Sequence, residues 1–174
     1  MRTLLSVLAV SVFPGVAAAQ SFDGPSVGLQ LSYGDVETSG PSLDGEDTLI
    51  GIRAYYDVDF GNFIAGGGFQ YDSTEIDLDG AADIDDVFRL AGRVGVSSGP
   101  AYYYGTAGFV QASTSGPADA GDSDGYFVGA GVEAFVADNI TVGGEVLYHE
   151  FDDFDISSLD AEVTTLGVNV NYRF

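Results

Sequence analysis

The sequence contains no cysteine, no lysine and no tryptophan. The absence of cysteine excludes a disulfide framework and any metal site built on thiolates. Basic residues number only 5, all of them arginine, against 27 acids, so the formal net charge is −22. Binding to nucleic acid needs clusters of lysine and arginine that neutralise phosphates. The charge balance therefore excludes nucleic acid as a partner.

Long apolar runs are also missing. Beyond residue 19 no stretch reaches the roughly 18 apolar residues that a membrane-spanning helix needs. The first 19 residues carry Arg2, then a short apolar run over 4–13, then three alanines at 17–19. This order is typical of a secretory signal peptide, and a buried first helix is the alternative. We expect a signal peptide over 1–19 and one mature domain over 20–174, which could cross a membrane only as a closed barrel.

What the chain does contain is apolar alternation, seen most clearly in its last eleven residues. Every second side chain from Leu166 to Phe174 is apolar, and the residues between them are small or polar. A period of two predicts a β-strand with one apolar and one polar face. The strand has no proline and no acid, and it ends on an aromatic residue.

The same alternation recurs seven more times along the chain, over 25–36, 48–58, 63–72, 88–96, 101–111, 126–134 and 140–149. In the strand over 101–111 the outward face stays open: either Tyr103 and Phe109 or Tyr102 and Tyr104 lie on it. The connections alternate in length, and most of the acids fall in the long ones, which cover 37–47, 73–86, 112–124 and 150–162. Strands of about ten residues joined in this way predict an all-β fold, an eight-stranded antiparallel up-and-down transmembrane β-barrel. Both mature ends should then lie on the side of the short turns.

The terminal Phe174, with Tyr172 and Val170 at the preceding alternate positions, resembles the closing strand of a bacterial outer-membrane β-barrel. The resemblance extends over 25–174, to small porin-family barrels such as the OmpA transmembrane domain and the opacity-type surface proteins of Gram-negative bacteria. It implies a place in the outer membrane among its lipids and lipopolysaccharide. It also implies that Val170, Tyr172 and Phe174 form the signal read by the barrel-assembly machinery.

The charged residues of the strands all fall on the polar faces. An arginine facing the middle of a bilayer costs roughly 2–4 kcal/mol, so these faces should line the barrel interior. We therefore predict a network inside the barrel that pairs arginines with glutamates, made of Arg53, Arg89, Arg93, Glu133 and Glu145. Either the network fills and stiffens the interior or it lines a narrow ion path. An eight-stranded barrel is only wide enough for side chains to fill, which favours the first.

Signals for catalysis or cofactor binding are weak. The single histidine, His149, has no hydroxyl nucleophile beside it in the sequence, so no catalytic residues and no cofactor are predicted and the protein is not expected to be an enzyme. The acidic stretches suit Ca²⁺ or Mg²⁺, and the weak candidates for a metal site are Asp77, Asp79, Asp83 and Asp85. Solvated acidic loops are the alternative interpretation.

The resulting function hypothesis is a structural and surface-interaction protein of the outer membrane with long acidic external loops. A narrow, cation-preferring channel is the alternative. A lipid-modifying enzyme and a secreted lipocalin-type barrel are weaker hypotheses, because the histidine lacks partners and the terminal aromatic belongs to membrane barrels. The external binding partner and the oligomeric state stay open.

Overall fold

The computed structural model describes residues 21–38, 45–78, 82–115, 123–151 and 161–174. These residues form eight β-strands: β1 (Gly24–Thr38), β2 (Gly45–Asp59), β3 (Ile64–Leu78), β4 (Ala82–Ser98), β5 (Ala101–Ser115), β6 (Ser123–Ala137), β7 (Ile140–Phe151) and β8 (Ala161–Arg173). In the described part of the chain no helix is long and apolar enough to cross a membrane.

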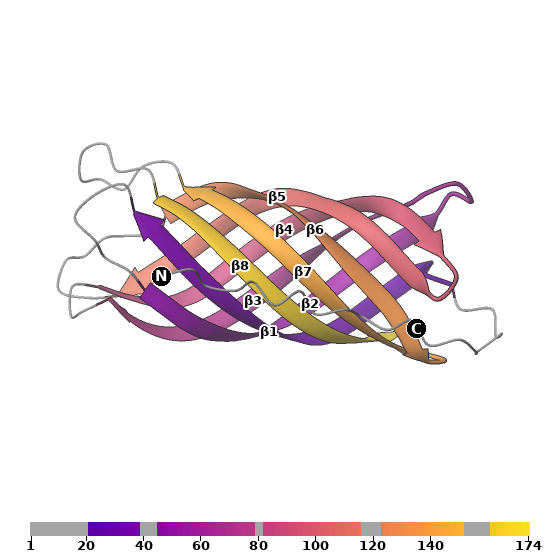
Figure 1. Ribbon diagram of the computed structural model, residues 1–174, viewed down its shortest axis with the longest axis horizontal. Coiled ribbons are helices and arrows are strands. Elements are labelled where there is room, and N and C mark those ends of the chain that lie inside the picture. Colours follow the sequence, from indigo (N-terminus) through magenta and orange to yellow (C-terminus); the bar gives the residue numbers. More distant parts are fainter. Residues whose placement is uncertain (1–20, 39–44, 79–81, 116–122, 152–160) are drawn as a thin grey trace, which may run out of the picture.

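The strands close into one barrel in which each strand is antiparallel to the next (Figure 1). The seam is formed by β1 and β8, whose pairing runs from Ser26 opposite Arg173 to Thr38 opposite Ala161. Closure leaves no sheet edge, so each strand finds backbone hydrogen-bond partners on both sides, the condition for a β-structure in lipid. The predicted fold class is confirmed.

Short turns join β2 to β3, β4 to β5 and β6 to β7 at one end of the barrel, which we call the turn end. The first two contain Gly61 and Gly99, whose φ angles of 86° and 59° favour glycine. The chain also ends at the turn end with Phe174 (Figure 1). The opposite end, where β1 connects to β2, β3 to β4, β5 to β6 and β7 to β8, is called the loop end.

The strands are longer than predicted at the loop end. The sequence analysis assigned 73–86 to a loop, whereas β3 continues to Leu78 and β4 starts at Ala82. Strands also extend into the other three predicted loops, since β1 continues to Thr38, β5 to Ser115 and β7 to Phe151. The reason is that an antiparallel ladder is held by backbone hydrogen bonds and needs apolar alternation only where one face leaves water.

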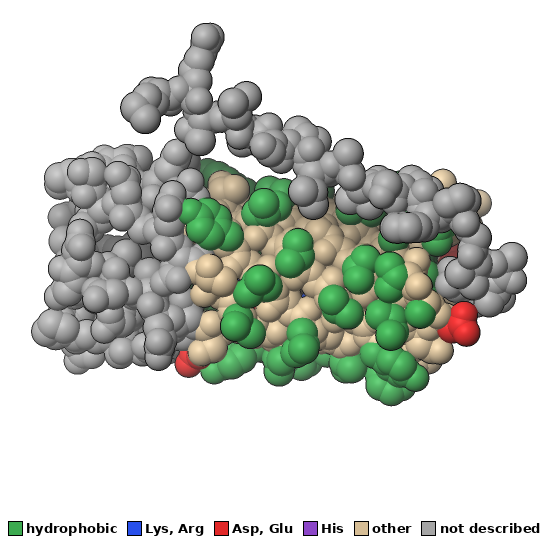
Figure 2. All heavy atoms as spheres, turned by 60° about the horizontal axis from the view of Figure 1, so that its bottom comes forward, with side chains coloured by type: hydrophobic (Ala, Val, Ile, Leu, Met, Phe, Trp, Pro, Cys, Tyr) green, Lys and Arg blue, Asp and Glu red, His purple; other side chains and the backbone are tan. Residues whose placement is uncertain are grey.

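The outward face of the barrel is apolar. Figure 2 shows hydrophobic side chains spread over the middle of the surface, with acidic side chains only near the two ends of the described part. The open question on β5 is resolved, because Tyr103 is 49% exposed and Tyr102 is 0% exposed. On the adjacent strand Gly131 makes room for the inward ring of Tyr104, since an added Cβ there would lie 2.5 Å from that ring.

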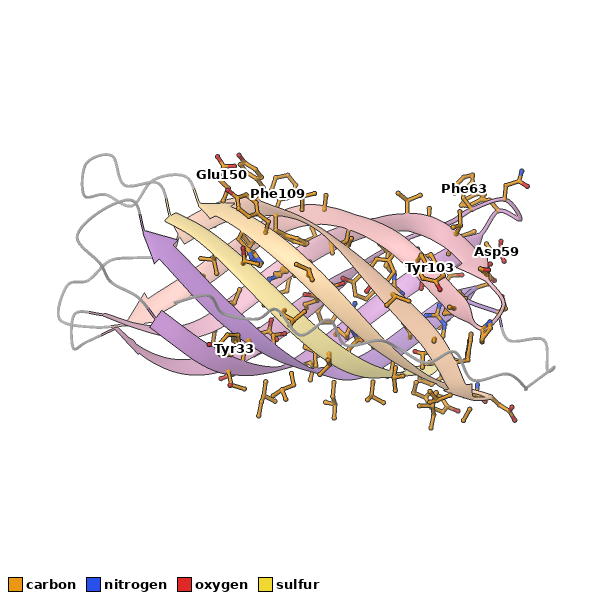
Figure 3. The ribbon with its side chains drawn as sticks, viewed as in Figure 1. Tyr33, Asp59, Phe63, Tyr103, Phe109 and Glu150 are labelled. Carbon is orange, nitrogen blue, oxygen red and sulfur yellow. The ribbon has the colours of Figure 1, made fainter. Side chains whose placement is uncertain are left out.

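Exposed aromatic side chains lie toward both ends of the barrel. Figure 3 shows Tyr33 and Phe109 toward the loop end and Phe63 and Tyr103 toward the turn end. The exposed side chains between these levels are largely aliphatic, as Leu29 illustrates. Aromatic belts around an aliphatic band are the surface pattern of a β-barrel that spans a bilayer.

Candidate functional site in the barrel interior

Alternate residues of every strand point into the barrel, and these side chains carry its charges. Among the described residues, the buried basic groups are four arginines, Arg53, Arg89, Arg93 and Arg173, and the buried carboxylates are Asp57, Asp72, Glu133 and Glu145. Four positive and four negative charges balance inside the barrel. Buried charges need partners because desolvation of an unpaired ion costs several kcal/mol.

Nearest the turn end, four of these residues form a closed ring of ion pairs, the turn-end ring. Arg93 binds Asp57 at 2.5 Å and Glu133 at 3.2 Å. Arg173 binds the same two acids, at 2.7 Å and 3.0 Å. Since the members come from β2, β4, β6 and β8, the ring ties together every second strand of the barrel.

The next layer is centred on Glu145 of β7. One carboxylate oxygen accepts from Arg53 Nη2 at 3.4 Å and from the Tyr104 hydroxyl at 2.9 Å. The other accepts from Gln70 Nε2 at 2.9 Å. The ring of Tyr55 lies 4.9 Å from the Arg53 guanidinium and 4.1 Å from that of Arg93, so cation–π contacts link this layer to the turn-end ring.

The layer toward the loop end is built on Arg89 of β4. Its Nη1 pairs with Asp72 of β3, which also accepts a 2.6 Å hydrogen bond from Gln30 of β1. Arg89 Nε donates to His149 Nε2 at 2.9 Å, and His149 Nδ1 lies 3.2 Å from the carbonyl oxygen of Val163. Nε2 must accept the hydrogen bond from Arg89, so it carries no proton. His149 is therefore neutral, with its proton on Nδ1 facing the carbonyl oxygen of Val163. His149 is therefore a structural member of the layer.

Apolar side chains flank the charged layers inside the barrel. One cluster, away from the turn end, contains buried Leu49, Val110, Phe127 and Leu147. A second cluster contains Phe22, Ile64, Tyr102 and Tyr104, with Phe135 packed against it. Ion pairs set between apolar groups are shielded from water and interact more strongly than pairs on a surface.

In the structure, four of the five residues of the predicted network form arginine–glutamate ion pairs: Arg53 with Glu145, and Arg93 with Glu133. The fifth, Arg89, pairs with neither glutamate, which corrects the prediction. The register places Gln70 opposite Arg89, so Asp72 is the diagonal neighbour on the same inward face and is nearer than either glutamate.

Three charged members of the interior were not included in the predicted network: Asp57, Asp72 and Arg173. Alternation already places all three on polar faces. The signal that could have found them is charge neutrality, because three arginines and two glutamates leave one positive charge unpaired, and Arg173 adds a second. Two further acids were needed to balance the charge, and Asp57 and Asp72 were inward-facing candidates.

The remaining predicted residues lie outside this interior network. Val170, Tyr172 and Phe174 point outward on the closing strand and are exposed, and the rings of Tyr172 and Phe174 are 5.0 Å apart. Of the four candidate metal ligands, Asp79 lies outside the described residues. The other three lie in β3 and β4 with side chains that are not described, and the described residues hold no cluster of three metal-ligating groups.

The chain matches known outer-membrane proteins in sequence. The family model described as "Outer membrane protein beta-barrel domain" matches residues 3–174. The "22 kDa outer membrane protein" of Rhizobium leguminosarum bv. viciae is 30% identical over 211 aligned positions, which cover 99% of this chain and 100% of the relative.

Solved structures show the same fold. Neisserial surface protein A superposes with a TM-score of 0.59 at 14% identity, covering 87% of this chain and 98% of its own. The attachment invasion locus protein Ail of Yersinia pestis, solved with the heparin analogue sucrose octasulfate, superposes with a TM-score of 0.60 at 17% identity, covering 88% of this chain and 100% of its own. Together with the closed eight-stranded barrel, these matches show that the chain belongs to the family of outer-membrane β-barrel proteins and resides in the outer membrane.

Proposed function

We propose that the protein is a structural and surface-interaction component of the outer membrane, a rigid barrel that displays acidic loops and does not conduct. The observation that supports this proposal is the charge-balanced network inside the barrel, tied across alternate strands and flanked by apolar clusters. Side chains fill an interior of this width, and paired ions in it hold the strands in one register. The function then rests with the loops.

The loops offer one kind of chemistry. Acids crowd the loop-end segments 73–86, which includes the ends of β3 and β4, and 150–162, and neither segment contains a basic residue. Such loops attract cations, and Ca²⁺ or Mg²⁺ held there could bridge to phosphates of lipopolysaccharide. The Ail structure contains a sulfated heparin analogue. A polyanion of that kind does not suit this chain, because the described arginines are all buried inside the barrel.

A binding measurement tests the loop proposal. Vesicles carrying the mature protein should bind a lipopolysaccharide-coated sensor in millimolar Ca²⁺ and should release when the metal is chelated. Replacing Asp152, Asp153 and Asp155 with asparagine should reduce the binding several-fold, because the net negative charge that holds the cation falls. The matched control replaces the turn-end acids Asp59 and Asp138, which should leave the binding unchanged. Binding that ignores either the metal or the loop substitutions would contradict the proposal.

The closing strand has a proposed role of its own in assembly. Val170, Tyr172 and Phe174 form an exposed apolar row along β8 and the residue after it, and β8 is the strand that pairs with β1 at the seam. A row of this kind on the last strand suits recognition by the barrel-assembly machinery before the seam closes. The inward residues of the same strand, such as Arg173, serve the interior instead.

A narrow cation path is the second candidate function. It is favoured by three buried polar atoms that have no hydrogen-bond partner within the described residues: Arg53 Nε, Gln70 Oε1 and Arg173 Nε. Buried groups of this kind are normally satisfied by ordered water. Water at these positions would place polar sites along the interior, although the equal numbers of buried positive and negative groups provide no net attraction for cations.

A further inference from the structure

The three described residues that precede β1 fold into the turn end of the barrel. A short segment outside a strand at the start of a domain is usually exposed and frays. Phe22 is instead only 2% exposed, although the chain enters β1 two residues later, at Gly24. The burial of this side chain therefore requires specific contacts.

The ring of Phe22 contacts three strands from inside the barrel. Its centroid lies 5.3 Å from that of Tyr102 on β5 and 4.7 Å from that of Phe135 on β6. The guanidinium of Arg173 on β8 lies 5.0 Å from the ring centroid. One aromatic side chain thus spans the interior directly beside a member of the turn-end ring.

Hydrogen bonds fasten Phe22 and the residue after it, Asp23, to the barrel. Arg173 Nη2 donates to the carbonyl oxygen of Phe22, and the backbone N–H of Asp59 donates to Asp23 Oδ1 at 2.9 Å. Gly24 has a φ of 102°, which turns the chain from the interior into β1 and strongly favours glycine. These contacts hold the segment in one position across the mouth of the barrel.

We propose that residues 21–23 are a built-in plug that closes the turn-end mouth of the barrel, with Phe22 as the group that excludes water from the turn-end ring. Arg173 connects the two functions, because the same guanidinium binds the plug and completes the ring of ion pairs. Loss of the plug should open the turn-end layer to solvent while the rest of the barrel stays closed.

Thiol labelling tests the plug directly, because the chain has no cysteine of its own. A probe thiol is placed by Ile64→Cys, behind Phe22 in the same buried cluster. The refolded mature protein is treated with a charged, water-soluble methanethiosulfonate reagent. Adding Phe22→Ala should raise the labelling rate at least about tenfold, as local opening does. Adding Phe60→Ala, an exposed phenylalanine at the same end, should leave it unchanged.

Two further variants separate plug loss from general loosening. A probe at Val110→Cys, in the other apolar cluster, should stay protected when Phe22→Ala is present. Gly24→Ala should raise labelling at position 64 while every lumenal side chain stays intact, whereas Gly61→Ala, which strains a turn in a similar way, should not. Unchanged labelling at position 64 in both plug variants, or an equal increase at positions 64 and 110, would overturn the proposal.

Discussion

Replacing Asp57 with alanine is expected to lower the free energy of unfolding by about 3–5 kcal/mol, because two buried arginines lose the carboxylate that both bind. Asp57 is completely buried and accepts from Arg93 through two nitrogens, at 2.8 and 2.5 Å, and from Arg173 at 2.7 Å. No other described carboxylate contacts both arginines except Glu133, whose two oxygens they already occupy. Urea unfolding in detergent micelles, followed by circular dichroism, measures the loss.

The matched control for this substitution is Asp138→Ala in the turn between β6 and β7, where the side chain is exposed. A surface change of this kind should shift the free energy of unfolding by no more than about 0.5 kcal/mol. A loss for Asp57→Ala that is as small as that of the control would mean that the turn-end ring does not stabilise the barrel. The role given to the buried network would then be wrong.

Replacing Ile52 with arginine is expected to cost about 2–4 kcal/mol of folding free energy in a bilayer, since the side chain sits on the outward face at the middle of β2. Ile52 is 52% exposed and lies opposite Leu29 of β1 and Tyr71 of β3, both outward residues. In lipid the guanidinium has neither water nor a carboxylate near it. Folding into vesicles of defined thickness, followed by gel shift, measures the cost.

The same change near the membrane surface provides the comparison. Val58 has the same β-branched character, lies on the same face of β2 and is close to the turn that follows Asp59. Arginine there should cost only about 0–1 kcal/mol, because its side chain reaches water. Equal costs at positions 52 and 58 would contradict the placement of the bilayer across the middle of the strands.

Alternation alone predicted most of the fold. The two-residue period assigned Arg53 to the interior and Ile52 to the outside, because a register slip would expose a charge to lipid. Strand ends at the loop end were less predictable. The acid-rich segments were predicted to be loops, yet Asp77 and Asp83 pair in the ladder between β3 and β4. The reason is that the backbone hydrogen bonds of a ladder do not depend on the side chains.

The partners inside the barrel were harder to predict than the faces. Which inward residues meet across the interior depends on the stagger of the strands, and no local pattern encodes the stagger. Arg89 therefore pairs with its diagonal neighbour Asp72, and Asp57 on β2 reaches both Arg93 on β4 and Arg173 on β8. Phe22 could not be predicted at all, because three residues before a strand carry no periodicity.

The most direct measurement on the proposed function is single-channel recording of refolded residues 20–174 in planar bilayers. A filled, charge-balanced interior should give no steady conductance, at most rare flickers below a nanosiemens, because ions have neither a path nor a net charge to enter. Steady, cation-selective steps that disappear when Glu133 or Glu145 is changed to glutamine would contradict this. The polar interior would then be a path, and the barrel a channel.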